Sequence, residues 1–127
     1  MHRYERLDIW KRGIALAARV HALALRSTRW ADQSLWRQIS RAAVSIPANV
    51  AEGAQRGSDR EFARFLGIAM GSAAELHTLL VLARETDALS TTEAPALARE
   101  ALELRRMAAA LRARVLGMPR RSKNLSD

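Results

Sequence analysis

The side chains that most often bind metals or perform catalysis are few in this sequence and lie far apart. The 127 residues include no cysteine and three histidines, His2, His21 and His77. The lack of cysteine excludes disulfides, thiolate metal sites and cysteine nucleophiles, and the histidines do not have the HExxH spacing of a zinc site. We therefore expect no bound metal, and we expect His21 on the buried face of a helix.

The glycine pattern excludes a phosphate-binding loop. Gly53 and Gly57 flank a short segment, but Glu52-Gly-Ala-Gln-Arg-Gly-Ser58 lacks the GxxxxGK[ST] pattern and follows no strand. We interpret both glycines as turn residues, with Gly53 as the left-handed C-cap of a helix. No nucleophile is spaced next to a base, so we expect no enzymatic activity and no cofactor.

Polar residues with helical spacing form one distinct row. Its members are Gln38, Arg41, Ser45, Asn49 and Glu52, followed on the next helix by Ser72, Glu75 and Thr78. Intervals of three and four place such side chains on one side of a helix. In an antiparallel hairpin Glu75 would approach Arg41, which predicts a partly buried ion pair that fixes helix or subunit register. The alternatives are a solvated face and, more remotely, an enzymatic site built on Arg41, Glu52 and Glu75.

The chain is basic, and its charge is unevenly distributed. It has 21 Lys and Arg, all but two of them Arg, against 13 Asp and Glu, a formal net charge of +8. Residues 1–30 have a net charge of +5 and residues 91–127 of +4, whereas residues 31–60 have +1 and residues 61–90 have −2. Arginine favours bidentate contacts with carboxylate or phosphate. The distribution therefore favours a nucleic-acid partner, with an Arg-rich composition of no functional meaning as the alternative.

The arginines near the two ends of the chain recur at seven-residue intervals on the outward side of predicted helices. The candidate nucleic-acid-binding residues are Arg12, Arg19, Arg26, Arg105, Arg106 and Arg112. Such rows can follow a phosphate backbone with an affinity that falls steeply as salt rises. No aromatic residue interleaves with them, so these rows are not expected to stack on bases. A solvated surface with intrahelical pairs to Glu100 and Glu103 is the alternative.

Four segments with apolar residues at helical intervals must position these side chains, and none shows strand alternation. The first helix is predicted from about Glu5 to Arg26, before a polar connection over 27–34. Its expected buried face is Leu7, Trp10, Ile14, Ala17, His21 and Ala24. The expected buried face of the second is Leu35, Ile39, Ala42, Ala43, Ile46 and Val50. Pro47 is predicted to kink this second helix because proline removes a backbone donor.

Capping signals mark the starts of the last two helices. Ser58 and Glu61 form a capping box, and Gly67 and Gly71 predict a close helix or subunit contact along the third helix. The expected buried face of the third helix is Phe62, Phe65, Leu66, Ala69, Ala73, Leu76, Leu80 and Ala83. The fourth is predicted to begin at Thr91-Thr-Glu-Ala-Pro95 and to end before Gly117. Its expected buried face is Leu97, Ala101, Leu104, Ala108, Leu111 and Val115.

Two further expectations concern the tryptophans and the membrane. Trp10 is expected in the core, whereas Trp30 and Trp36 either anchor a neighbouring subunit or fold over the end of the bundle. No apolar run approaches the roughly 20 residues that span a bilayer. The first residues also lack the apolar stretch of a signal peptide. We therefore expect a cytoplasmic protein without a membrane partner.

Three segments of the sequence resemble a known family. They are Leu7-Asp-Ile-Trp-Lys11, then Gln38-Ile-Ser-Arg-Ala-Ala-Val-Ser-Ile-Pro-Ala-Asn-Val-Ala-Glu-Gly53, then Glu61-Phe-Ala-Arg-Phe-Leu66 with Ala69-Met-Gly-Ser-Ala-Ala-Glu-Leu76. They resemble the small proteins encoded within intervening sequences of bacterial 23S ribosomal RNA genes. That resemblance implies a four-helix bundle that assembles as a homopentamer and has no established enzymatic activity. Its relatives include the accessory protein of diversity-generating retroelements, which resembles a basic, nucleic-acid-binding pentamer.

These observations combine into one prediction. We expect an all-α, up-down-up-down four-helix bundle over residues 1–118 and a flexible basic tail over residues 119–127. We expect a non-enzymatic homo-oligomer, a pentamer by the resemblance, that binds RNA or DNA, mainly RNA, through backbone contacts on the first and last helices. The alternative is a structural or protein-interaction assembly with another protein as partner and no role in nucleic-acid binding.

Overall fold

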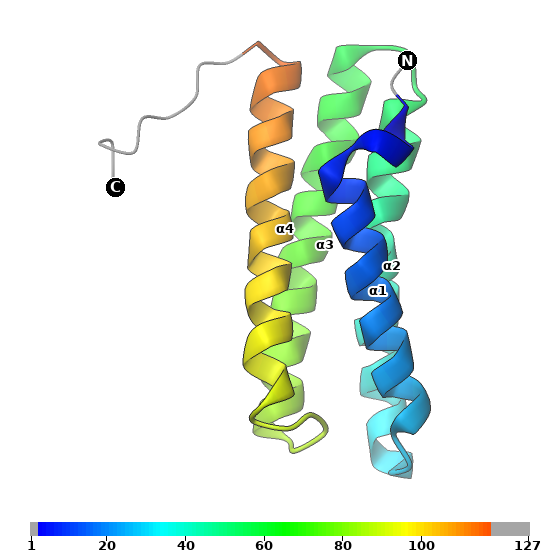
Figure 1. Cartoon of the computed structure of the whole chain (residues 1–127), viewed down its shortest axis with the longest axis vertical. Helices are drawn as coiled ribbons and strands as arrows, with labels where there is room; N and C mark the ends of the chain where they lie inside the picture. The colour runs from blue at the N-terminus through cyan, green and yellow to red at the C-terminus, as the bar shows by residue number, and fades with distance from the viewer. Residues whose placement is uncertain (1–2, 118–127) are drawn as a thin grey trace, which may run out of the picture.

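The chain folds into four long helices that run alternately up and down, as predicted (Figure 1). The structure is a computed structural model that describes residues 3–117. The long helices are α1 (Asp8–Arg26), α2 (Gln33–Ala54), α3 (Asp59–Glu85) and α4 (Glu93–Val115). Two short 3-10 helices, η1 (Tyr4–Arg6) and η2 (Trp30–Asp32), precede α1 and α2. The predicted tail over 119–127 lies outside the described residues.

The predicted buried face of α1 is right only in part, because Leu7, Trp10, Ala17 and Ala24 pack at the edge of the core and the centre of the buried face lies one position away. The buried residues are Ile9, Gly13, Leu16 and Val20. Ile14 is 45% exposed and His21 is exposed, although both were expected in the core. A Cβ on Gly13 would lie 3.2 Å from the ring of Pro47. Because only glycine allows α1 to approach α2 this closely, the Gly13 side of α1 faces the core and the Ile14 side faces outward.

The buried faces of α2 and α3 are as predicted, but the end of α2 differs. Gly53 is not a left-handed cap, because α2 continues to Ala54 and Gly53 is buried inside it. A Cβ on Gly53 would lie 2.6 Å from the Cβ of Phe65, so this glycine allows α2 and α3 to pack closely. The positive φ of 84° belongs to Gly57 in the connection. Pro47 lies within α2, and the kink there stays a prediction.

The helix starts are capped partly as predicted. The Ser58 hydroxyl accepts the backbone N–H of Glu61 at 3.2 Å, which confirms the start of α3. The Glu61 carboxylate accepts from Arg64 on the next turn. At α4 the predicted threonine cap is wrong, because Thr92 makes no side-chain cap bond and the Ser90 hydroxyl accepts the N–H of Glu93 at 3.0 Å.

Two observations on the core helix α3 bear on expectations from the sequence, and the first leaves a subunit contact at Gly71 as a prediction. Gly71 is exposed, and no atom lies within 4 Å of the position that a Cβ would take, so no close contact among residues 3–117 explains this glycine. An apolar stretch of 18 residues within α3 is long enough to cross a membrane, contrary to the expectation from the sequence. A core helix of a bundle meets the same criterion, and 44% of this stretch is buried against the other helices.

Candidate nucleic-acid interface

Five of the six candidate arginines are exposed on α1 and α4, which are antiparallel neighbours. Arg12, Arg19 and Arg26 lie along α1, and Arg105 and Arg106 lie on α4. The sixth, Arg112, is half-buried on α4 and turns towards α3, where its Nε donates to the backbone oxygen of Ala63 at 3.2 Å. Most of the predicted arginines are therefore exposed on α1 and α4. Arg112 is not part of this exposed set because it contacts α3.

A row of glutamates on α4 faces the arginines of α1. Arg12 donates from Nε and Nη2 to the two carboxylate oxygens of Glu100, both at 2.9 Å, and its Nη1 lies 3.8 Å from Glu103. Arg26 lies 3.7 Å from Glu93. The hydrogen bond from Arg106 is the main cause that lowers the pKa of Glu103, and the bond to Glu100 raises the pKa of Arg12. Ion pairs thus join α1 to α4 along much of their length.

Only part of the arginine row is free to meet a ligand. Arg19 and Arg105 are exposed and make no hydrogen bond or ion pair with any residue between 3 and 117. Glu100 and Glu103 were expected only as intrahelical partners, so the pairing across helices is a new finding. The seven-residue spacing between Glu93 and Glu100 matches that of the α1 arginines, and this match could have revealed the pairing.

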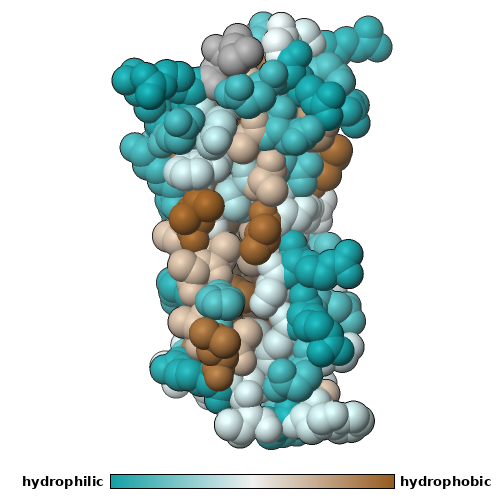
Figure 2. Space-filling model, turned by 90° about the vertical axis from the view of Figure 1, so that its right-hand side faces the viewer, coloured by the Kyte–Doolittle hydropathy of each residue, from teal (hydrophilic) through white to brown (hydrophobic). Residues whose placement is uncertain are grey.

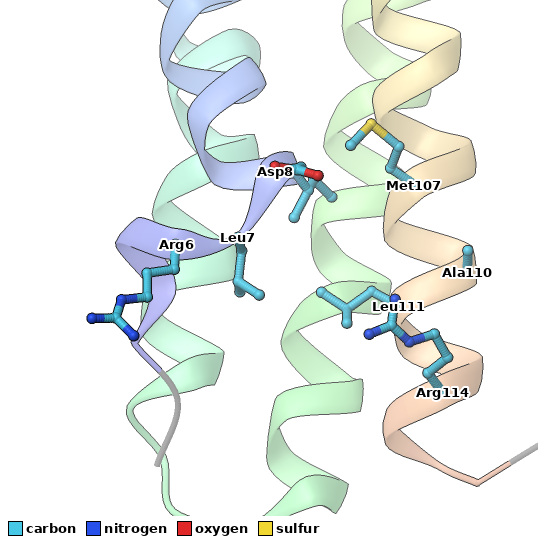
Figure 3. Close-up of a pocket in the computed structure, with 8 residues that line it drawn as sticks. Arg6, Leu7, Asp8, Met107, Ala110, Leu111 and Arg114 are labelled. Carbon is cyan, nitrogen blue, oxygen red and sulfur yellow. The ribbon is translucent and has the colours of Figure 1, made fainter.

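Two shallow cavities lie between α1 and α4, on either side of the Arg12–Glu100 pair. One, of about 290 Å³, has Leu7, Met107 and Leu111 on its walls, with Arg6 and Arg114 among its other lining residues (Figure 3). The other, of about 350 Å³, is lined by Arg19, Ala22, Leu23, Arg26 and Glu93. Both cavities combine apolar side chains with arginine and one carboxylate, Asp8 in the first and Glu93 in the second.

The polar row of α2 and α3 is a helix contact at its centre and solvated at its ends. The hydroxyls of Ser45 and Ser72 lie 2.7 Å apart, and Asn49 Nδ2 donates to the backbone oxygen and hydroxyl of Ser45 at 2.8 and 3.0 Å. The predicted Arg41–Glu75 pair is wrong, because both side chains are exposed and form no ion pair within residues 3–117.

The ends of the same row confirm this division. Gln38 and Thr78 are exposed, and Glu52 pairs at 2.6 Å with Arg56, which lies just beyond the end of α2. Charged pairs between α2 and α3 therefore do not set the register of these helices in the described part of a single chain. The Ser45–Ser72 hydrogen bond and the close approach at Gly53 do so.

An exposed apolar strip runs along the outer side of α1 and α2, and we call its three large residues the α1–α2 strip. They are Ile14 at 45%, Leu25 at 73% and Val44 at 56% exposure. Exposed alanines such as Ala18 and Ala48 lie on the same two helices. Figure 2 shows apolar side chains gathered along one side of this face, between polar ends. Large contiguous apolar surface on a folded chain is typical of a protein contact.

The tryptophans divide between the two predicted alternatives. Trp36 is buried, with 3% of its surface exposed, and folds into the end of the bundle. Trp30 is 90% exposed. Trp10 is partly buried against the core, as expected. Within the described part of the chain, no group of three or more acidic or histidine side chains is placed to hold a metal ion.

Comparisons with known proteins agree with the fold. The family model of the 23S rRNA-intervening sequence protein matches residues 5–110. A crystal structure of a protein of unknown function from the S23 ribosomal protein family of Bacteroides thetaiotaomicron is similar to this chain, with a TM-score of 0.76 and 22% identity. The similarity covers 82% of this chain and 94% of the other. The comparison with curated proteins finds no match. Because the family model spans most of its length, this chain belongs to the 23S rRNA-intervening sequence protein family.

Proposed function

We propose that the protein is a non-enzymatic, cytoplasmic scaffold that forms a homo-oligomer and binds nucleic acid, mainly RNA, through phosphate contacts on α1 and α4. The observation that carries the proposal is the pair of exposed arginines, Arg19 on α1 and Arg105 on α4, which make no hydrogen bond or ion pair with residues 3–117. A guanidinium without a protein partner is available for a bidentate contact with a phosphate.

The overall charge supports this proposal. The net charge is +8 per chain, so five copies in one particle would carry +40. A field of this sign raises the local concentration of a polyanion and speeds its association. The glutamate row lowers the charge of the face between α1 and α4, so phosphate contacts are proposed at the free arginines on either side of it.

The exposed apolar strip supports self-association. Val44 and Leu25 keep more than half of their surface in contact with solvent in a single chain. Burial of such surface between copies is favourable by about 25 cal/mol per Å². The number of five copies rests on the family resemblance. Trp30 offers a further large apolar surface.

A second candidate function is a protein-interaction assembly without a nucleic-acid role. The specific observation that favours it is the pairing of Arg12, Arg26 and Arg106 with glutamates, because these three arginines have a structural role that needs no ligand. Under this alternative the strip on α1 and α2 binds another protein and the remaining charge only keeps the particle soluble.

A salt titration of RNA binding separates the two functions. The probe is a fluorescent 20-nucleotide single-stranded RNA of mixed sequence, and the test variant is Arg19→Ala with Arg105→Ala. The control is Arg37→Ala with Arg84→Ala, which removes the same charge from exposed arginines of α2 and α3. Each lost phosphate contact should reduce the slope of log K against log salt by about 0.7.

The proposal expects the test variant to bind RNA more weakly and with a shallower dependence of log K on log salt. It expects the control to change little in either quantity. It fails if the wild type shows no binding at physiological salt. It also fails if both double variants weaken binding equally, because a uniform effect would indicate net charge without a defined face.

A further inference from the structure

The core helix α3 has apolar side chains on its outer side as well as on its buried side. An apolar stretch of 18 residues runs through it, and 44% of this stretch is buried within the chain. Ile68 and Leu82 lie on the exposed side, with 41% and 47% of their surface in contact with solvent. A helix that is apolar all round is normally covered on all sides. The outer side of α3 therefore has no cover among residues 3–117.

One charged residue lies on this outer side. Glu75 is seven residues from both Ile68 and Leu82, so the three exposed side chains share one side of α3, and we call them the α3 row. Between Arg64 and Arg84, Glu75 is the only Asp, Glu, Lys or Arg in the sequence. It is exposed and makes no hydrogen bond or ion pair with residues 3–117. A partner that covers the α3 row must therefore offer this carboxylate a positive charge.

The outer side of α2 offers such a charge beside apolar surface. Arg41 is exposed and makes no hydrogen bond or ion pair with residues 3–117. Val44 and Ala48, three and seven residues later, are exposed on the same side of α2, and Val44 has 56% of its surface exposed. We call these three residues the α2 row. Each of the two rows combines apolar surface with one unpaired charge, and the two charges have opposite signs.

The charges of the two rows lie at nearly the same level along the bundle. The hydroxyls of Ser45 and Ser72, 2.7 Å apart, mark one level on the antiparallel helices α2 and α3 (Figure 1). Arg41 lies four residues before Ser45, about 6 Å along α2. Glu75 lies three residues after Ser72, about 4.5 Å along α3 and in the same direction, because the helices are antiparallel.

We propose that the α2 row of one copy packs against the α3 row of the next copy, with an ion pair between Arg41 and Glu75 across the contact. The inference rests on the self-association in the proposed function and names the surfaces that meet. Copies in a closed ring are related by rotation alone, so residues keep their level from copy to copy when the ring axis runs along the bundle. The same register brings Ala48 towards Ile68, since both lie on the opposite side of the serine level from Arg41.

A second copy fits the α3 row better than a lipid bilayer does. The apolar stretch of α3 is long enough to cross a bilayer, but it contains Glu75, and a charge inside a bilayer without a partner is costly. A second copy supplies Arg41 at the matching level. The contact uses α2 and α3, so Arg19 on α1 and Arg105 on α4 stay outside it and remain accessible to RNA.

Charge reversal followed by light scattering tests the ion pair. Arg41→Glu and Glu75→Arg each place like charges across every contact, so each should weaken association at least about tenfold. The particle mass should then fall at a protein concentration that fully assembles the wild type. The double variant, Arg41→Glu with Glu75→Arg, restores opposite charges and should regain most of the wild-type mass. Arg99→Glu is the matched control, because Arg99 is exposed on α4 and its reversal should leave the mass unchanged.

A mixture of the two single variants shows whether the pair joins different chains. Arg41→Glu has acidic residues at both positions and Glu75→Arg has basic residues at both, so opposite charges meet only between unlike chains. Mixing equal amounts should therefore give particles larger than either variant forms alone. Both positions are exposed, so circular dichroism should show the wild-type helix content in each variant.

The outcomes separate this inference from the proposed function. A wild type with the mass of one chain would overturn both the contact and the proposed self-association. A wild-type oligomer whose mass survives both single reversals, or a double variant and a mixture that both stay dissociated, would overturn the contact alone. The RNA titration with Arg19→Ala and Arg105→Ala tests the nucleic-acid contact independently of these results.

Discussion

Glycines illustrate at the scale of single residues how one residue type serves two different purposes. Gly53 lies where α2 meets α3, and a Cβ there would overlap the Cβ of Phe65 at 2.6 Å. Gly71 lies on the exposed side of α3, with open space around it among the described residues. Packing between helices requires the first glycine, and no packing within residues 3–117 requires the second.

The two glycines predict opposite effects of the same substitution. Gly53→Ala should destabilise the bundle by about 1–3 kcal/mol, because overpacking forces the helices apart. Gly71→Ala should raise the free energy of unfolding by up to about 1 kcal/mol, because alanine has a higher helix propensity than glycine at an exposed position within a helix. Denaturant unfolding of both variants beside the wild type measures the difference. A loss of stability in Gly71→Ala would show that Gly71 has a partner in the assembled protein.

At the scale of helices, surface ion pairs bridge α1 and α4, whereas a close packing contact joins α1 to α2. Glu103 accepts from Arg106 and lies 3.8 Å from Arg12, and Glu100 holds Arg12 through two hydrogen bonds. On the other side of α1, Gly13 packs directly on the ring of Pro47. Because ion pairs depend on pH and packing does not, the contact between α1 and α4 is the one that should respond to acid.

The lowered pKa of Glu103 gives the sign of the response to acid, and its main cause is Arg106 on the same helix, with a smaller contribution from Arg12 of α1. Its folded pKa lies below its unfolded value because Arg106 hydrogen-bonds to it, so the ionised form stabilises the fold. This contribution is present above the unfolded pKa of about 4.3 and is lost as pH falls through the lower folded pKa. Glu103→Gln should therefore flatten the decline of the melting temperature between about pH 5 and pH 3.

The control for this pH experiment is Glu85→Gln. Glu85 is exposed and has no ion pair within residues 3–117, so its substitution should leave the acid-induced decline unchanged. An equal flattening in both variants would contradict the assignment of the effect to the ion pairs of Glu103.

At the scale of the whole molecule, the charged and apolar surfaces lie on different sides of α1. The side of α1 that faces α4 carries Arg12, Arg19 and Arg26. Ile14 and Leu25, which are eleven residues apart and so share a side of the helix, are exposed on a different side of α1. This separation allows copies to associate through the α1–α2 strip while the arginine row stays accessible. The proposed oligomer and the proposed nucleic-acid contact are therefore compatible on one particle.

Disruption of the α1–α2 strip should change the mass of the particle. Val44→Glu places a charge in the strip, which should weaken the association of the 14.1 kDa chains. The particle mass measured by light scattering should then be lower than that of the wild type. Leu102→Glu is the control, because Leu102 is 47% exposed but lies on α4. A wild-type mass of one chain would overturn self-association, and a mass of five chains would support the pentamer.

Much of the bundle could be predicted because the longest apolar rows of α2, α3 and α4 are the rows that face the core. Ile39 and Ile46 on α2, Leu66 on α3 and Leu97 on α4 are all buried, as their spacing predicts. The first helix offers two apolar rows, one through Gly13 and Leu16 and one through Ile14. Hydrophobic periodicity did not show which row is buried. Gly13 has no apolar side chain to strengthen its row in the sequence pattern, although a glycine allows the closest packing between helices.

The sequence by itself determined the number, order and approximate limits of the helices, since these depend on local spacing, caps and turn residues. Tertiary structure alone decided which arginines remain free, because Arg12 meets Glu100 only when α1 and α4 lie side by side. It also brought together the residues that line a cavity of about 230 Å³ at the end of the bundle where α2 and α4 begin. Asp32 and Glu93 are about half the chain apart, and only the packing of the helix ends places them around one volume.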